Sequence, residues 1–497
     1  MRVCGTRVLG AEPSVAAKTI KLKCEVKVQN MSKKLLEPGL PRGFEDSFGK
    51  SLFLEKKLKE IIENNFLKYG YQEIKTSPFE YSENIGAFLA DDLNNPSNEI
   101  FTFRDKDRNI SLRYDLSAPL SRFVGERYLE LAFPFKRYQI SEVYRNETSK
   151  TGRGRYRSFV QADFDQIFAG KVSPQSNAEI VQIIQDTLLE CKFNKNQFKI
   201  NIFNRKIIEG LLDDLKIQDE RQRFKVLRAV DKYDRIKSNF IDLLKKERVD
   251  PVSGDKIAGA NLSDDQASAI VDFLNIKDLK TFKSTFKNNL QKDGIQELEE
   301  ILDILSCNNY NEQVQIDPSR VRGLNYYDSY VIETTVNFKV ENKQKKLVEL
   351  GSIASGGSYS QLCSRFKGGN NFQGTGCSFG ISRIVYLMMQ LNQLKVNGIF
   401  PVIVCPMKKK YLTYANELAF ILRKNNINTE IYPDPNKNLG KQLTYANKKS
   451  NSVACIIGEN EFNDKTITLK NLLATKGEDN QSTIPKENLV NEIKKLI

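Results

Sequence analysis

The residues with the clearest chemistry stand in a strand-like segment near residue 160. Period two places Gln161, Asp163 and Asp165 on one face of this segment, and Arg145 ends the segment expected to pair with it. An arginine beside carboxylates and an amide can bind a phosphate and a cationic amine at the same time. Because salt-bridged sheet surfaces often show the same residue types, the pattern by itself leaves both a ligand site and a structural surface open.

An acid and a hydroxyl two residues apart, Asp115 and Ser117, form a second candidate. Their oxygens could jointly accept hydrogen bonds from an ammonium group. Aspartate and serine at the start of a helix more often act as caps, because their side chains accept from the first free backbone N–H groups. The pair therefore indicates either an amine site or a helix cap.

A glycine turn carries the third candidate. Arg322 stands beside Gly323 and is followed by the paired tyrosines Tyr326 and Tyr327. Paired tyrosines usually pack in a core, whereas an arginine next to a glycine permits a ligand to approach the backbone closely. Both interpretations stay open on this evidence alone.

Two further glycine-rich stretches follow. Residues 352–359 end in Tyr359, and residues 374–384 lead into an expected helix that carries Arg383. A glycine-rich turn before a helix can cradle phosphate through its backbone N–H groups, but such a turn is weak evidence by itself.

Composition excludes several reaction classes. The chain of 497 residues contains no histidine and no tryptophan, so catalysis cannot use a Ser-His-Asp triad, an imidazole base or a histidine-ligated zinc ion. Its eight cysteines include no CxxC pair, which argues against a zinc ribbon or a thioredoxin-type site and favours reduced thiols in a cytosolic protein. The formal charge of +14 favours a polyanionic partner such as nucleic acid. No apolar run approaches the ~18 residues of a membrane span.

The expected elements position these candidates in an interrupted antiparallel sheet. An amphipathic helix over 52–69 and a short strand over 72–76 precede the alternating segments 136–145 and 156–167. Residues 200–315 have a helical period and few glycines, and strands with glycine turns resume afterwards. From residue 398 strands alternate with helices, which predicts a small α/β domain. The segments expected there are Ile399–Val404, Tyr411–Lys424, Asn428–Tyr432, Leu439–Lys448, Val453–Ile457 and Thr466–Leu469.

The N-terminal segment shows no sustained apolar period. Residues 1–30 contain six basic and two acidic residues, and Met31 resembles an ordinary start. Three interpretations compete: an upstream extension from start-codon choice, a disordered basic tail, and an organellar transit peptide, which should be rich in arginine and serine. Serine is scarce in this segment.

In this order, the segments resemble the histidyl-tRNA synthetase family from about Pro41 to the C-terminus. The strand end at 144–147 looks like motif 2 of the class II synthetases, residues 376–384 look like motif 3, and the 52–78 helix and strand look like the dimer-forming motif 1. Residues 321–327 and the Ser-Gly-Gly-Ser-Tyr segment are similar to the two histidine-specific signatures.

The resemblance implies an α+β fold, with a class II antiparallel-sheet catalytic domain, a helical insertion and a C-terminal α/β anticodon-binding domain. The implied boundaries are a disordered N-terminal extension at 1–37, a catalytic core at 38–199 and 316–397, an insertion at 200–315 and an anticodon-binding domain at 398–497.

The resemblance also implies the reaction and its partners. ATP would activate L-histidine as histidyl-adenylate, and the histidyl group would pass to the 3′ end of tRNA(His), with Mg²⁺ bridging the phosphates. The enzyme would be a cytoplasmic homodimer without a membrane segment, or an organellar one if residues 1–30 are a transit peptide. The insertion would touch the acceptor stem and the C-terminal domain the anticodon.

Roles for single residues follow from the same resemblance. Arg145 and Arg322 would be the catalytic residues, each on the α-phosphate of ATP. Histidine would be bound by Asp115, Ser117, Gln161, Asp165, Tyr326, Tyr327 and Tyr359, with the first three at the α-amino group. ATP would be bound by Arg145, Glu147, Arg155, Arg322 and Arg383. No general base is needed, because the histidine carboxylate that attacks is already ionised.

The chain departs from the family at four positions around the signatures. Ser358 and Ser360 stand where an arginine and an aspartate are usual, and Asp328-Ser329 stand where threonine and glycine are commoner. Three other proteins with this fold compete as interpretations: a truncated paralogue that regulates histidine biosynthesis, a pseudo-synthetase that senses uncharged tRNA, and a class II enzyme for another amino acid. The arginines at 145, 322 and 383 and the presence of residues 398–497 favour the charging enzyme.

Overall fold

The structure of the chain is a computed structural model. It describes residues 37–85, 100–146, 156–233, 240–246, 248–249, 256–257, 259–321, 327–342, 345–360, 362–366, 371–391, 401–474 and 480–497. No helix within these ranges is both long enough and apolar enough to cross a membrane.

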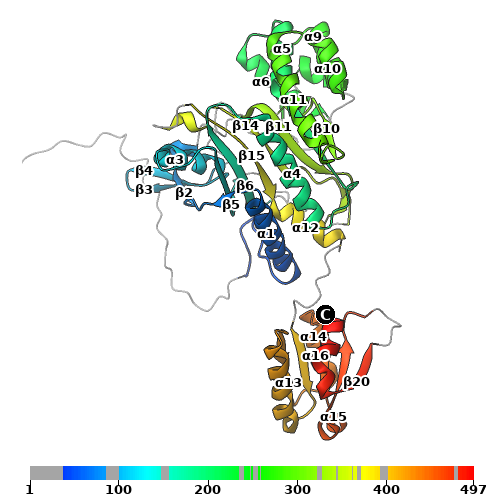
Figure 1. Cartoon of the computed structure of the whole chain (residues 1–497). Helices are drawn as coiled ribbons and strands as arrows, with labels where there is room; N and C mark the ends of the chain where they lie inside the picture. The colour runs from blue at the N-terminus through cyan, green and yellow to red at the C-terminus, as the bar shows by residue number, and fades with distance from the viewer. Residues whose placement is uncertain are drawn as a thin grey trace, which may run out of the picture. The chain divides into compact units, whose positions relative to one another are not determined.

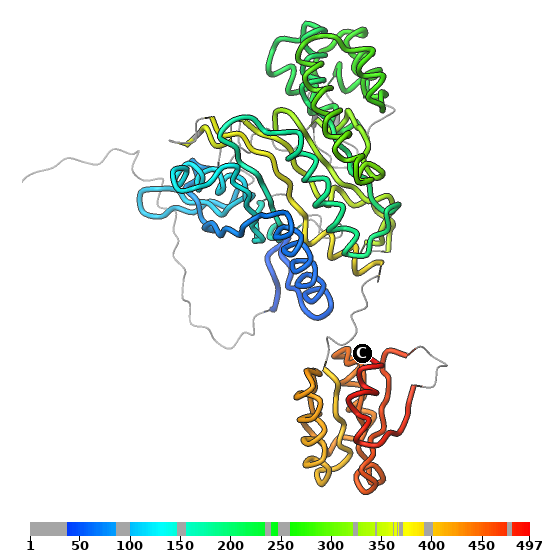
Figure 2. The backbone as a smooth tube through the Cα atoms, in the orientation of Figure 1, coloured from blue at the N-terminus to red at the C-terminus, as the bar shows by residue number. Residues whose placement is uncertain are grey.

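An eight-stranded sheet, called here the central sheet, organises the described residues between 42 and 391 (Figures 1 and 2). Its six inner strands run antiparallel to one another, and each edge strand is parallel to its neighbour. In spatial order the strands are β1 (Gln72–Glu73), β5 (Phe135–Tyr144), β6 (Ser158–Ala169), β15 (Phe372–Gly380), β14 (Ala354–Tyr359), β11 (Tyr327–Val336), β7 (Phe198–Asn204) and β10 (Val314–Ile316).

Helices α1 (Lys50–Lys68), α4 (Pro174–Glu190) and α12 (Ile381–Leu391) pack on one face of the central sheet. Helix α1 buries Leu58, Ile62 and Phe66, a spacing of four that keeps one side of a helix toward the core. The Phe66 ring lies 4.9 Å from that of Phe164 on β6. Burial of each such side chain contributes ~1.5–3 kcal/mol, so Phe66→Ala would loosen this layer.

The other face of the central sheet carries α3 (Ser117–Arg127) and a small sheet. Leu120 and Val124 of α3 pack against Phe135 and Ile167, side chains on this face. The small sheet has the order β2 (Phe79–Tyr81), β4 (Arg108–Leu112) and β3 (Thr102–Asp105), next to α2 (Ser82–Ile85). A hairpin of β12 (Val340–Glu341) and β13 (Leu347–Val348) precedes β14.

The described residues between β7 and β10 are mainly helical, as their period predicts, and include one short hairpin. The elements are α5 (Arg205–Asp214), α6 (Glu220–Val230), α8 (Phe240–Lys245), β8 (Arg248–Val249), β9 (Lys256–Ile257), α9 (Asp264–Asn275), α10 (Leu279–Thr285) and α11 (Asn289–Ser306). Buried side chains of these helices belong to the same continuous hydrophobic core as those of α1, α4 and the central sheet. Strands β7 and β10, at the two ends of the expected insertion, are themselves strands of the central sheet.

Residues 401–474 and 480–497 form a five-stranded α/β unit with a hydrophobic core of its own. Its elements in chain order are β16 (Val402–Pro406), α13 (Leu412–Lys424), β17 (Thr429–Ile431), α14 (Leu439–Lys448), β18 (Val453–Ile457), α15 (Glu459–Asp464), β19 (Thr466–Asn471), β20 (Gln481–Pro485) and α16 (Leu489–Leu496). Strands β17, β16 and β18 are parallel, whereas β18, β19 and β20 are antiparallel.

Most expected elements are confirmed within one to three residues, among them α1, the β5–β6 pair, α13 and α14. Strand β20 was not predicted. Its sequence Gln-Ser-Thr-Ile-Pro lies mostly exposed, so no apolar alternation marks it.

Candidate functional site

Alternation along β6 gives the two faces of the central sheet different roles. Phe164 belongs to the core beneath the helices, and its neighbours Asp163 and Asp165 point to the opposite face. Across the ladder Asp165 is opposite Arg137 on β5 and Gly376 on β15. The period-two prediction for Gln161, Asp163 and Asp165 is therefore confirmed, and these side chains form the floor of a site.

Glycine makes room for this floor. A Cβ atom at Gly376 would lie 2.1 Å from Oδ1 of Asp165, and one at Gly374 would lie 2.4 Å from the ring of Tyr359. No side chain fits at either position unless the aspartate or the tyrosine moves. The glycine-rich stretch of β15 therefore serves close packing against polar side chains of the neighbouring strands.

Asp165 is buried and both of its oxygens have partners. Its Oδ2 forms an ion pair of 2.5 Å with Arg137, and its Oδ1 accepts a hydrogen bond of 2.8 Å from the hydroxyl of Tyr359. Burial raises the pKa of Asp165, while the Arg137 charge and the Tyr359 hydrogen bond oppose that rise. Two partners thus fix the orientation of this carboxylate.

Tyr327 lies beside Tyr359, with 6.5 Å between ring centroids. The two residues are paired across β11 and β14, and the backbone oxygen of Tyr327 accepts a hydrogen bond of 2.6 Å from Arg205 on α5. The first helix of the insertion therefore contacts the strand end that carries an expected histidine ligand.

Asp115 and Ser117 lie at the start of α3. Oδ1 of Asp115 accepts from the backbone N–H groups of Ser117, at 3.2 Å, and Ala118, at 3.0 Å, so the helix-cap interpretation is confirmed. Burial raises the pKa of Asp115, and these N–H groups and the Arg145 charge oppose the rise. Both of these hydrogen bonds use Oδ1 of Asp115. Its Oδ2 could still accept from an ammonium group, so the interpretation as an amine site stays open.

A pocket of about 270 Å³ adjoins this floor. Arg145 and Arg383 both line it, as the resemblance implies for ATP-binding residues, and none of the described residues in its lining carries a carboxylate. The Arg145 guanidinium lies over the rings of Tyr114 and Phe159, at 4.3 and 5.1 Å from their centroids. Two arginines beside aromatic rings suit a ligand that carries both phosphate and a flat base. The full lining comprises Arg145, Tyr156, Phe159, Gln161, Ser352, Ile353, Ala354, Ser355, Ser378, Gly380, Ser382 and Arg383.

Four of the expected site residues lie outside the described residues. They are Glu147, Arg155, Arg322 and Tyr326.

Two functional candidates received no role from the sequence. Arg137 is the buried partner of Asp165, and Ser378 on β15 donates a hydrogen bond to Asp163. Arg137 could be identified from the sequence only with the register between the two strands, because pairing Tyr144 with Ser158 places Arg137 opposite Asp165. For Ser378 no short-range signal exists, because its partner is more than 200 residues away.

Three of the four departures from the family pattern, Ser358, Asp328 and Ser360, lie in two places. Ser358 is buried on the helix side of the sheet, where its hydroxyl contacts Asn177 of α4 and Thr375 at 3.1 Å each. Asp328 and Ser360 contact each other: Oδ2 of Asp328 accepts from the backbone N–H of Ser360 at 2.8 Å, and from its hydroxyl. Ser358 thus points away from the site, and the other two departures together tie β11 to the end of β14.

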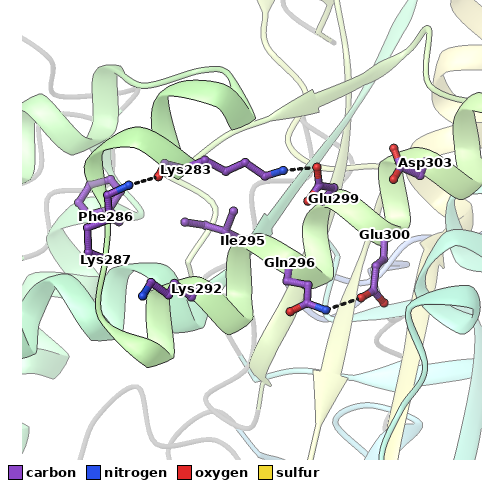
Figure 3. Close-up of a pocket in the computed structure, with 9 residues that line it drawn as sticks. All are labelled: Lys283, Phe286, Lys287, Lys292, Ile295, Gln296, Glu299, Glu300 and Asp303. Carbon is purple, nitrogen blue, oxygen red and sulfur yellow. Dashed lines mark hydrogen bonds and ion pairs between the residues drawn. The ribbon is translucent and has the colours of Figure 1, made fainter.

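A second pocket, of about 420 Å³, lies on the surface of α10 and α11 (Figure 3). Several of its charged and polar side chains interact with other residues of the same pocket. Lys283 pairs with Glu299, Lys287 donates to the backbone oxygen of Lys283, and Gln296 donates to Glu300. Compared with the pocket beside Arg145, it is open, of mixed charge and remote from the buried carboxylates.

Comparisons with known proteins agree with this architecture. A family model described as histidyl-tRNA synthetase matches residues 43–384, and one described as an anticodon binding domain matches residues 401–496. A histidine–tRNA ligase of Pelagibacter ubique is 55% identical over 474 residues, covering 94% of this chain and 100% of the relative. A histidine–tRNA ligase of Ruegeria pomeroyi is 33% identical, covering 87% and 89% of the two chains. The crystal structure of histidyl-tRNA synthetase from Nostoc sp. PCC 7120 superposes with a TM-score of 0.72 at 25% identity, covering 93% of this chain and 100% of that one.

Proposed function

The chain belongs to the histidyl-tRNA synthetase family, and from this premise we propose how the described site performs the reaction. The protein is a class II histidine–tRNA ligase, which uses ATP to attach histidine to tRNA in protein synthesis. The roles of single residues, the place of Mg²⁺, the dimer and the cellular location are the proposed parts.

Asp165 is the proposed acceptor for an N–H group of the substrate imidazole. Its burial and its fixed contacts with Arg137 and Tyr359 support this role, because a preorganised buried acceptor loses little on binding. A site that hydrogen-bonds a ring N–H rejects analogues without one by ~10⁴ or more, so no editing domain is required. Tyr327 and Tyr359 would orient the ring, together with Tyr326.

The α-ammonium group is assigned to Asp115, Ser117 and Gln161. An ammonium has three donors and needs as many acceptors when it is buried. Oδ2 of Asp115, the Ser117 hydroxyl and Oε1 of Gln161 could supply them. The charge of Asp115 would also offset the positive charge of the amine.

The pocket beside Arg145 is the proposed ATP site. Arg145 would contact the α-phosphate and Arg383 the distal phosphates, because both line a pocket whose described lining has no carboxylate. The proposed roles of Arg322, Arg155 and Glu147 rest on the family resemblance alone. Glu147 would accept from the adenine amine.

The chemistry needs positioning and charge neutralisation more than proton transfer. A carboxylate oxygen of histidine would form a bond to the α-phosphorus as the bond to the pyrophosphate oxygen breaks, which yields histidyl-adenylate. The oxygen of a terminal ribose hydroxyl of tRNA would then bond to the carbonyl carbon as the bond from that carbon to the phosphate oxygen breaks. AMP would leave, and its phosphate would take up the hydroxyl proton. Orientation alone can supply ~7–11 kcal/mol of rate enhancement, so a chain without histidine can catalyse both steps.

The observation that carries this assignment is the arginine-lined pocket directly beside the Gln161–Asp163–Asp165 floor. ATP–pyrophosphate exchange tests it, with histidine compared with every other amino acid. Exchange with histidine alone, lost in Arg322→Ala and in Arg145→Ala, is the expected result. Full exchange in both variants would contradict the assignment of the pocket.

We further propose that Mg²⁺ arrives on the phosphates of ATP, as part of the nucleotide substrate. Among the described residues no group of three carboxylates or thiols could hold a metal ion, and the proposed ATP pocket has no carboxylate in its lining. Mg²⁺ commonly keeps phosphate and water ligands, so a protein-built cage is unnecessary.

A homodimer is proposed from the motif 1 elements. Large apolar side chains remain exposed on α1 and on the small sheet, and an isologous interface would cover the same residues of both copies. The exposed residues are Leu52, Leu67, Phe79, Tyr81 and Phe103. Sedimentation of the wild type and of Phe103→Asp tests this: a dimer that becomes a monomer is expected, whereas a monomeric wild type would contradict it.

The remaining proposals concern tRNA and location. Residues 401–496, which match an anticodon-binding model, are the proposed anticodon contact, and the helical insertion is the proposed acceptor-stem contact. The cytoplasm is the proposed location, consistent with free thiols at the described cysteines.

A further inference from the structure

A chain of two hydrogen bonds runs across the floor of the site from Gln161 to Asp163. Nε2 of Gln161 donates to Oγ of Ser378 at 2.8 Å, and the Ser378 hydroxyl donates to Oδ1 of Asp163. The pairing of β6 with β15 places these side chains together. Ser378 is the cross-strand partner of Asp163, and Gly380 is the cross-strand partner of Gln161.

The direction of this chain is fixed by the donors available. Above the pKa of Asp163, which burial raises to about 7, its ionised carboxylate can only accept, and a serine hydroxyl has one hydrogen to give. Ser378 therefore gives its hydrogen to Asp163 and offers only a lone pair to Gln161. Because only an N–H can donate to that lone pair, the amide nitrogen of Gln161 must face Ser378.

The amide oxygen of Gln161 is consequently turned away from Ser378. Oε1 is buried and has no hydrogen-bond partner among the described residues. A buried acceptor without a donor is destabilised by ~1–3 kcal/mol, which a bound donor would relieve. Gln161 thus carries a preset acceptor in the site assigned to the substrate amine.

We propose that Asp163 and Ser378 are positioning residues that hold the amide of Gln161 so that its Oε1 accepts from the α-ammonium group of histidine. The inference rests on the proposed function, since the amine belongs to that substrate. A reversed amide would present N–H groups to the ammonium and repel it. The two hydrogen bonds that join Gln161, Ser378 and Asp163, called here the relay, therefore determine whether Gln161 attracts or repels the amine.

Two substitutions break the relay in different ways. Ser378→Ala removes the hydroxyl that joins Gln161 to Asp163. The Gln161 amide is then no longer held with its nitrogen toward residue 378. Asp163→Asn keeps the shape, but its amide can donate to Ser378, which frees the serine hydrogen for Oε1 of Gln161 and lets the amide turn. Ser358→Ala is the matched control. It removes a buried hydroxyl from β14 of the same sheet, on the face that packs against the helices.

The test is titration calorimetry of each variant without ATP, using two ligands, at about pH 8.5, where Asp163 with its pKa of about 7 is ionised. One is L-histidine, and the other is 3-(imidazol-4-yl)propanoate, which lacks only the amine. We expect Ser378→Ala and Asp163→Asn each to raise the Kd of histidine about tenfold, and to leave that of the amine-free ligand within about twofold. The double variant should be no worse than either single one, because the relay acts as a unit. Ser358→Ala should not change the ratio of the two Kd values.

Two results would overturn the inference: an unchanged Kd for histidine in both relay variants, or an equal loss for both ligands. If Ser378→Ala does not fold, Asp163→Asn alone decides between the expected and the contrary result. A wild type that fails to bind histidine would instead refute the proposed function. The two failures are therefore distinguishable.

Discussion

Arg137 and Asp165 form a buried ion pair of 2.5 Å between neighbouring strands, β5 and β6. Arg137 is the cation that most strongly opposes the raised pKa values of both Asp163 and Asp165. Its Nε and Nη1 have no hydrogen-bond partner among the described residues, so its hydrogen-bonding capacity is only partly used. A single buried guanidinium therefore holds a group of carboxylates that would otherwise repel one another.

Arg137→Met should test this arrangement. Removing one member of a buried pair leaves an unpaired charge, so we expect a loss of ~3–5 kcal/mol in the free energy of unfolding. Urea unfolding at neutral pH measures it. Arg137→Lys, which keeps the charge, should lose less, and equal stabilities of the Arg137→Met variant and the wild type would contradict the role of the pair.

Asp165→Asn should reduce kcat/KM for histidine about 100-fold in pyrophosphate exchange, since a charged acceptor for the ring N–H is lost. The KM for ATP should change little. Tyr359→Phe is the milder comparison, because it removes only the hydroxyl that orients Asp165. A KM for histidine about fivefold higher is expected there, and an effect larger than that of Asp165→Asn would argue that Tyr359 contacts the substrate directly.

Arg145→Lys should raise the KM for ATP about tenfold or more and should not restore the activity lost in Arg145→Ala. Lysine keeps the positive charge but lacks the planar fork that binds two phosphate oxygens and stacks on Tyr114 and Phe159. Initial rates of exchange at varied ATP provide the measurement. Wild-type kinetics in the lysine variant would show that charge alone suffices.

The contribution of Asp163 to the stability of the ligand-free protein should fall as pH rises from about 4 to about 7. Burial raises the pKa of Asp163 to about 7, partly opposed by Arg137, with Asp165 and Asp115 adding to the rise. The folded state therefore binds a proton that the unfolded chain has lost, so this contribution is present at low pH and disappears through the window up to pH 7. Thermal melts of wild type and Asp163→Asn measure it. The variant should show a smaller fall, and an identical pH profile would contradict the raised pKa.

Asp328 and Ser360 should behave as a coupled pair in a double-mutant cycle. Both side chains are near solvent, so we expect a coupling of about 0.5–1 kcal/mol in the free energy of unfolding for the alanine variants. The exchanged variant Asp328→Ser with Ser360→Asp should recover most of the loss. Strict additivity of the two alanine changes would show that the contact contributes nothing.

Some residues of the site can be placed from the sequence by local rules, and others cannot. Gln161, Asp163 and Asp165 share a face by alternation within a single strand, and Asp115 with Ser117 marks a helix start, so local rules place them. Arg137 depends on the register between two strands, and Ser378 on a pairing across more than 200 residues. Such pairings are decided by the packing of the whole sheet, which local periodicity does not contain.

The same limit applies to Ser358. From the sequence it is a departure within a substrate signature, next to Tyr359. In the sheet, adjacent residues point to opposite faces, so Tyr359 contacts Asp165 while Ser358 contacts Asn177 of α4. Its neighbourhood in the chain indicates a pocket residue, and only the three-dimensional pairing shows that it belongs to the packing between sheet and helix.

The continuous core beneath the central sheet has a consequence for how the protein can be dissected. Because the helices between β7 and β10 share that core with α1 and α4, they form one cooperative folding unit with the catalytic sheet. The last hundred residues have a separate core and can melt independently. Deleting α5 to α11 would therefore be expected to unfold the amino-acid site, whereas a chain ending at residue 391 should still melt in a single cooperative transition.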